Sequence, residues 1–266
     1  MTRNKKKGLA VIVFVMLMVL GGLVSQAKAV PITFTGSGTG VSGVALSASA
    51  AFTISGNTLT ISLSNIAPNN SGTDVPGNTL TGVFFDLTGN PTLTPTSATI
   101  AAGSLVQANK CDIGPCNGST TNVGGEFRYD TGSFPVGADR GIASAGYIGG
   151  AANFGGSNLD APSNGAVNGI NFGIISLDST FTPNGGLSGE PLIRNNVVFV
   201  LTGVSGLSES DISHVSFQYG TATNEPNVPG RTPVPEPSTL LLLGSGLMGM
   251  GWFGRKRLKD TKNPKV

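Results

Sequence analysis

The chain has 266 residues and a formal net charge of +2, but its charges are unevenly distributed. Between Val30 and Pro235 there are five lysines and arginines against twelve aspartates and glutamates, a net charge of about −7. A nucleic-acid-binding surface needs clustered Lys and Arg, so this composition excludes nucleic acid as a partner. A single histidine and two cysteines are too few to suggest a metal site or a bound cofactor.

The first 29 residues have the composition of a secretory signal peptide. A basic start with Lys5, Lys6 and Lys7 is followed by an apolar run over residues 9–24. Ala27 and Ala29 form an A-x-A cleavage site. We expect export by the Sec pathway, removal of residues 1–29 by signal peptidase, and a mature chain that begins at Val30. An uncleaved N-terminal anchor is the alternative.

Residues 30–220 are expected to form one extracellular domain. Apolar residues alternate with small or polar ones over 44–54 and again over 59–63, and Gly56-Asn57 lies between the two runs. This pattern predicts a β-hairpin with a two-residue turn, because glycine accepts the positive φ that such a turn requires. Segments of this kind predict an all-β fold, an antiparallel β-sandwich of jelly-roll-like type. Disorder of the Gly- and Ser-rich chain is the competing interpretation.

Further strands are predicted along the domain. Residues 80–87 and 197–201 are apolar on both faces, which is typical of central strands. Val215, Phe217 and Tyr219 alternate along a strand over 212–219. A strong strand is predicted over residues 170–177, and further strands are expected over residues 97–107 and 126–129.

The two cysteines, Cys111 and Cys116, lie in a polar loop with four residues between them. In an exported chain with no other cysteine, the default expectation is a disulfide between them. It would close a small loop, and its entropic stabilisation would be only a few kcal/mol.

Catalytic patterns are weak in this sequence. His214 follows Asp211 by three residues, but no G-x-S-x-G segment supplies a nucleophilic serine for a triad. Two pairs of carboxylates are close enough in sequence to consider for glycoside hydrolysis: Glu126 with Asp130, and Glu209 with Asp211. Nothing around them distinguishes them from surface acids, so we expect no catalytic residues and no enzymatic activity. A secreted hydrolase stays a remote alternative.

A carbohydrate-binding module is the other alternative. Such modules stack sugars on exposed aromatic rings, and the predicted domain has three tyrosines: Tyr129, Tyr147 and Tyr219. This hypothesis predicts a row of exposed tyrosines beside Asn and Asp on one sheet face.

The C-terminal part has a different organisation. Prolines recur over residues 221–233, which predicts an extended, semi-rigid linker. Pro235, Glu236 and Pro237 then precede an uncharged apolar run over 238–254. As a helix this run would span about 25 Å, which is marginal for a bilayer core of about 30 Å.

Three cations, Arg255, Lys256 and Arg257, close the apolar run and are expected to stay on the cytoplasmic side, with residues 259–266 as a cytoplasmic tail. Such a run could serve simply as a permanent C-terminal anchor.

The order of triplet, apolar run and basic cluster over residues 234–258 resembles the PEP-CTERM sorting signal of Gram-negative bacteria. The segment 215–221, followed by Glu225-Pro226, is similar to the end of the ectodomain in a family of exosortase-dependent surface proteins. The resemblance implies processing by an exosortase near Pro235 to Pro237. It also implies anchoring in the inner membrane before delivery to the cell surface or extracellular matrix, with exopolysaccharide as an expected partner.

Overall fold

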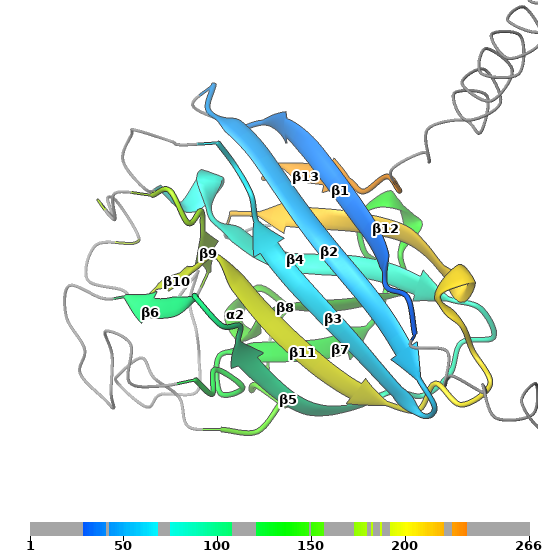
Figure 1. Cartoon of the computed structure of the whole chain (residues 1–266). Coiled ribbons are helices and arrows are strands. Elements are labelled where there is room, and N and C mark those ends of the chain that lie inside the picture. The colour runs from blue at the N-terminus through cyan, green and yellow to red at the C-terminus, as the bar shows by residue number, and fades with distance from the viewer. Residues whose placement is uncertain are drawn as a thin grey trace, which may run out of the picture. The chain divides into compact units, whose positions relative to one another are not determined.

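The structure is a computed structural model, shown in Figure 1, and its strands form two β-sheets. It describes residues 29–40, 43–68, 75–107, 121–148, 150–156, 173–179, 182, 187, 192–220 and 225–232. Within these ranges the only α-helix is the single turn α2 (Ala145–Ile148). The predicted all-β class is confirmed. In the described part of the chain, no helix is long and apolar enough to cross a membrane.

Sheet 1 has five strands in the order β1-β2-β3-β11-β5, and all its pairs are antiparallel. The bounds are β1 (Ile32–Thr39), β2 (Ala45–Ser55), β3 (Thr58–Asn65), β11 (Asn196–Thr202) and β5 (Thr94–Ile100). The predicted hairpin is confirmed: β2 and β3 pair from Ser55 and Thr58 inward, and Gly56 in the turn has φ of 59°. The predicted central strand over 197–201 is also confirmed, because β11 lies between β3 and β5.

Sheet 2 is larger and less regular. Its main path runs β13-β12-β4-β9-β10-β6, and β8 adds to β4 and carries β7. The bounds are β4 (Leu80–Leu87), β6 (Leu105–Gln107), β7 (Phe127–Thr131), β8 (Arg140–Ser144), β9 (Ile174–Ile175), β10 (Leu192–Arg194), β12 (Ile212–Tyr219) and β13 (Asn227–Pro229). The β9–β10 pair is parallel, so the sheet is mixed and the prediction of a wholly antiparallel fold is wrong there. The predicted buried strand over 80–87 is confirmed as β4.

The two sheets share one apolar core, which gives a sandwich-like arrangement. Phe52 of β2 meets Phe85 of β4 edge to face, with ring centroids 5.4 Å apart. Phe127 of β7 meets Phe199 of β11 in the same way at 5.0 Å. All four rings are completely buried. Aromatic pairs of this geometry stabilise a core beyond the effect of the buried area alone.

Three expectations are corrected by the strand order. Consecutive strands β1, β2 and β3 are neighbours in one sheet, and the sheets have five and eight strands, which does not match the eight strands and paired Greek keys of a jelly roll. The strand expected over 97–107 is two strands in different sheets, because the chain turns at Ala102-Gly103, where Gly103 has φ of 83°. Strand β1 lies in the stretch Ile32–Thr39, where the sequence predicted none.

Candidate functional site

The first candidate site is the segment that leads to the C-terminal tail, residues 225–232, which we call the exit segment. It contains β13, which pairs antiparallel with β12. The Tyr219 N–H donates to the carbonyl of Pro226 at 3.0 Å, and the Gly230 N–H donates to the carbonyl of Val215 at 2.8 Å. The side chain of Val228 is buried in the core. The exit segment is therefore held by backbone pairing and by apolar burial.

The exit segment also reaches the other sheet. Thr35 of β1 and Arg231 exchange two backbone hydrogen bonds of 2.8 Å each. The two residues thus form a hydrogen-bonded pair of the antiparallel type. Figure 1 shows β13 beside β1 at this edge of the fold. Because β1 is the edge of sheet 1 and β13 is the edge of sheet 2, the exit segment closes this side of the domain.

Two glycines of β1 make this closure possible. A Cβ atom on Gly36 would lie 2.8 Å from a ring carbon of Phe217 and 2.9 Å from the carbonyl oxygen of Pro229. A Cβ on Gly38 would lie 3.0 Å from a methyl group of Val228. In a strand, glycine often marks a place where another backbone approaches closely. Gly36 and Gly38 thus have a packing role here.

This geometry corrects the predicted linker over residues 221–233. Residues 225–232 belong to the β-domain, and the folded part extends to Thr232. The prolines suggested an extended stalk. Proline is also tolerated in an edge strand, because its missing backbone N–H is not needed on the side that faces solvent. Pro226 and Pro229 fit this role. The Pro226 carbonyl accepts a hydrogen bond from β12, and Gly230, the neighbour of Pro229, donates one to β12.

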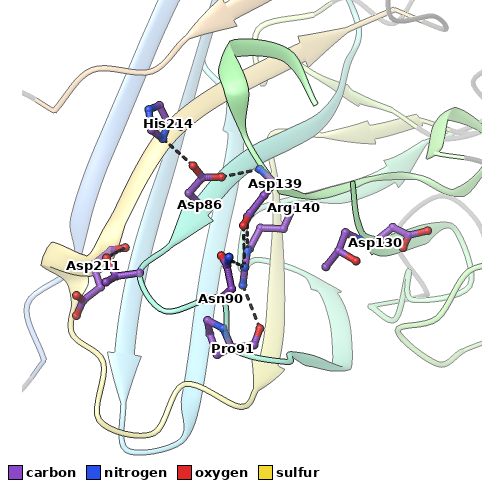
Figure 2. Close-up of polar contacts among 10 residues, drawn as sticks. Asp86, Asn90, Pro91, Asp130, Asp139, Arg140, Asp211 and His214 are labelled. Carbon is purple, nitrogen blue, oxygen red and sulfur yellow. Dashed lines mark hydrogen bonds and ion pairs between the residues drawn. The ribbon is translucent and has the colours of Figure 1, made fainter. Parts of the chain in front are cut away.

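The second candidate site is a polar network on sheet 2, in which Asp86 lies between His214 and Asp139 (Figure 2). Asp86 Oδ2 is 2.7 Å from His214 Nδ1, and Asp86 Oδ1 accepts the Asp139 N–H at 2.5 Å. Arg140 is 2% exposed and pairs with Asp139, with Nε 2.7 Å from Oδ1. Its other nitrogens donate to Asn90 Oδ1 at 3.1 Å and to the Pro91 carbonyl at 3.2 Å.

The electrostatics of this network stabilise the charged forms. The hydrogen bond from Arg140 holds the pKa of the Asp139 carboxyl below its usual value, against the opposing effect of partial burial. The arginine thereby joins the loop after β4 to the start of β8. The hydrogen-bond partners of Arg140 named above are all groups of the domain itself, so the network fits a structural role.

His214 has an unusual backbone conformation, with φ of 48°. The register between β12 and β4 shifts between Ser213 and Ser216, so His214 and Val215 form a bulge. On its other side β12 pairs with β13 in regular register, and the Val215 carbonyl accepts the Gly230 N–H of the exit segment. The one histidine of the chain thus directly precedes a residue that holds the exit segment.

The carboxylates considered for hydrolysis have structural partners. Glu209 Oε1 accepts the Ile54 N–H at 2.8 Å. Asp211 accepts the N–H of Ser208 at 2.9 Å, and this hydrogen bond lowers its pKa. Glu126 is 2% exposed, whereas Asp130 pairs with Arg128 at 2.9 Å. No group of three or more His, Cys, Asp or Glu side chains gathers for a metal ion among the described residues.

The exposed tyrosine row expected of a carbohydrate-binding module is not observed. Tyr129 is 6% exposed and Tyr219 is fully buried in the core. Burial raises the pKa of both hydroxyls. The side chain of Tyr147 lies outside the described residues. Two of the three rings are thus unavailable for stacking on a sugar, so this form of the hypothesis is wrong.

Several predicted residues lie outside the described ranges. These are Ala27 of the signal-peptide site, Cys111 and Cys116, the triplet Pro235, Glu236 and Pro237, the apolar run that follows, and Arg255, Lys256 and Arg257. The disulfide, the cleavage site and the membrane helix therefore stay predictions. Val30, the expected first residue of the mature chain, is 78% exposed.

Comparison with known proteins identifies one feature. Residues 233–257 match the PEP-CTERM protein-sorting motif. The chain therefore carries this motif directly after the exit segment, and the motif supports exosortase-dependent sorting of an exported protein that is anchored through its C-terminal tail. It implies an exosortase as the processing partner. No curated protein and no solved structure gives a significant match to the chain.

Proposed function

We propose that this chain is a non-catalytic surface or matrix protein of a Gram-negative bacterium. Its signal peptide directs export, its tail holds it in the inner membrane, and an exosortase processes it near Pro235 to Pro237. The β-domain is then delivered to the cell surface or the extracellular matrix, where it associates with exopolysaccharide. The sorting motif at residues 233–257 is the observation that carries this proposal.

The position of the exit segment supports a delivered, folded domain. The last described residue is Thr232, and the motif begins at residue 233. An enzyme that acts near Pro235 would meet the chain within a few residues of the Arg231–Thr35 bridge. Cleavage there would leave every described strand of both sheets in the delivered chain, because the last of them, β13, ends at Pro229.

The polar groups of the domain support a structural role. The carboxylates of Asp86, Asp139 and Glu209 accept hydrogen bonds from backbone or arginine donors of the fold. Groups engaged in this way fix loops and strand ends. An acid or base in catalysis must instead face a substrate.

The proposal is tested by expressing Glu236→Gln in the native host beside Asp178→Asn as a charge-matched control. Asp178 is an exposed residue in a turn of the β-domain. Cell fractions are compared by intact mass and by terminal peptide mapping. We expect wild type and the control to be recovered from the surface or matrix, with a chain that starts at Val30 and ends near Pro235 to Pro237.

The Glu236→Gln chain is expected to accumulate in the inner-membrane fraction with residues 240–257 still attached. The same accumulation of the wild-type chain is expected in a host without its exosortase. If wild type itself retains residues 240–257 in every fraction, the tail is a permanent anchor and the proposed delivery is wrong.

A further inference from the structure

A hollow of about 530 Å³ lies where the exit segment meets β1. Its volume falls within the range of about 300 to 1,000 Å³ that is usual for small-ligand sites. It is lined by residues of β1, β2, the end of β3 and the exit segment: Thr35, Gly36, Ser37, Ser47, Ile66, Pro229 and Arg231. The closure of the two sheets therefore creates a concave surface beside the start of the sorting motif.

Arg231 is distinctive among the arginines of the domain. Arg128 and Arg140 form ion pairs with Asp130 and Asp139, and Arg194 donates to the carbonyl of Ser179. Arg231 is exposed, and its side chain has no ion pair or hydrogen bond within the part of the chain that the structure describes. The backbone of Arg231 is held by two hydrogen bonds to Thr35, so the fold determines where its side chain begins.

The other lining residues suit an oxygen-rich ligand. Thr35 and Ser37 are exposed on the outer side of β1, and Ser47 lies opposite Ser37 in β2. Hydroxyl groups both donate and accept hydrogen bonds. Ile66 is 47% exposed and supplies an apolar surface for the carbon face of a ring. No described lining residue is acidic, although the domain as a whole is acidic.

We propose that this hollow binds a carboxylate-bearing sugar, chemically a uronic acid unit of an acidic polysaccharide. The guanidinium of Arg231 pairs with the carboxylate, since a planar fork of N–H donors matches two carboxylate oxygens. The hydroxyls of Thr35, Ser37 and Ser47 meet the sugar hydroxyls. This inference rests on the proposed function, because it assigns the ligand class through which the delivered domain would hold a matrix.

The test uses the full chain purified in a non-ionic detergent and titrated calorimetrically with trigalacturonic acid. Maltotriose, a neutral trisaccharide of similar size, is the reference ligand. We expect trigalacturonic acid to bind and maltotriose to bind at least about fivefold more weakly, because a charge-assisted hydrogen bond is stronger than a neutral one. The assay needs no exosortase, so its result is independent of whether the tail is processed.

Four variants locate the site. Arg231→Gln is expected to weaken binding about fivefold or more, and Arg231→Lys to weaken it less, since lysine keeps the charge but not the fork. Lys110→Gln, which removes the same charge elsewhere in the sequence, is expected to bind as wild type does. Ser37→Trp fills the hollow from an exposed strand position and is expected to abolish binding.

The melting temperature of each variant shows whether it is folded. Absence of binding by the wild-type chain, equal binding of maltotriose, or wild-type binding by both Arg231→Gln and Ser37→Trp would each overturn the proposal. Loss of binding by Lys110→Gln to the same extent as by Arg231→Gln would also overturn it, because the effect would then follow from net charge alone.

Discussion

The two sheets of this domain place their polar side chains differently. In sheet 1 the buried polar side chains are Asn65, the last residue of β3, and Asn196, the first residue of β11. In sheet 2 buried polar side chains also lie within the strands, among them Thr81 and Gln218, which are both 0% exposed. One sheet is therefore organised by apolar alternation, and the other also by hydrogen bonds between side chains and backbone.

The contacts in sheet 2 show what these polar groups do. Thr81 Oγ1 donates to the carbonyl of Gly220 at 2.8 Å, and Gln218 Nε2 donates to the carbonyl of Tyr219 at 2.7 Å. Asn227 Nδ2 donates to Gln218 Oε1 at 3.1 Å. These groups lie where β12 ends and the exit segment returns along it. Buried polar groups need partners, so sheet 2 uses them to fix the path of the chain toward the sorting motif.

The largest effect is expected in the apolar core. Phe52→Ala removes a fully buried ring that contacts Phe34 and Phe85, and we expect a loss of about 3 to 5 kcal/mol in the free energy of unfolding. Thr53→Ala, on the opposite face of β2, is the matched control and should cost less than about 1 kcal/mol. Urea unfolding of both variants measures the difference. A small effect of Phe52→Ala would contradict the shared core.

A smaller effect is expected in the polar network of sheet 2. Arg140→Gln leaves the acceptors of a buried guanidinium without their donor, and we expect a loss of about 1 to 3 kcal/mol, moderated because Asp139 is partly exposed. The control Arg128→Gln affects an ion pair that is about one-third exposed and should cost below about 1 kcal/mol. Equal losses for the two variants would contradict the structural role of Arg140.

The backbone at His214 gives a comparison between two substitutions. Both His214→Ala and His214→Gly remove the contact with Asp86, but only glycine adopts a positive φ without strain. We expect the alanine variant to be about 1 kcal/mol less stable than the glycine variant. Thermal unfolding of the pair measures this difference directly. If the alanine variant is as stable as the glycine variant, the bulge at His214 does not have the described conformation.

The smallest effect concerns the dependence of stability on pH. Because the folded chain holds the pKa of Asp139 below its unfolded value of about 4, ionised Asp139 stabilises the fold above that pH. This contribution is lost as the pH falls through the lower folded pKa. Asp139→Asn should therefore be less stable than wild type at pH 7 and should lose less stability on acidification to pH 2. Asp178→Asn serves as the control, and the same change in slope for it would count against the Asp139–Arg140 pair.

The sequence predicted those parts of the fold in which one pattern determines one structure. The hairpin of β2 and β3 followed from alternation and the Gly56-Asn57 turn, and β4 and β11 followed from their apolar runs. Strand β1 was missed because Gly36 and Gly38 weaken the strand pattern. Those glycines are needed only because the exit segment packs on them, which is a contact between residues far apart in the chain.

The candidate sites divide in the same way. The sorting motif was predicted because it is a local arrangement of a triplet, an apolar run and a basic cluster, and the match at residues 233–257 confirms it. The Asp86 network and the hollow beside Arg231 join residues from several strands, so no local sequence pattern predicts them. Proline at 226 and 229 was a misleading signal, since the same residue favours both linkers and sheet edges.

The exit segment is a fixed part of the domain, and it ends where the sorting motif begins. Hydrogen exchange of the full chain, resolved at single amides, tests this most directly. We predict that the N–H groups of Gly230, Arg231 and Thr35 exchange slowly, as hydrogen-bonded amides of a sheet do. Exchange of Gly230 and Arg231 at the rate of an unstructured peptide would contradict the account and return residues 225–232 to the role of a linker.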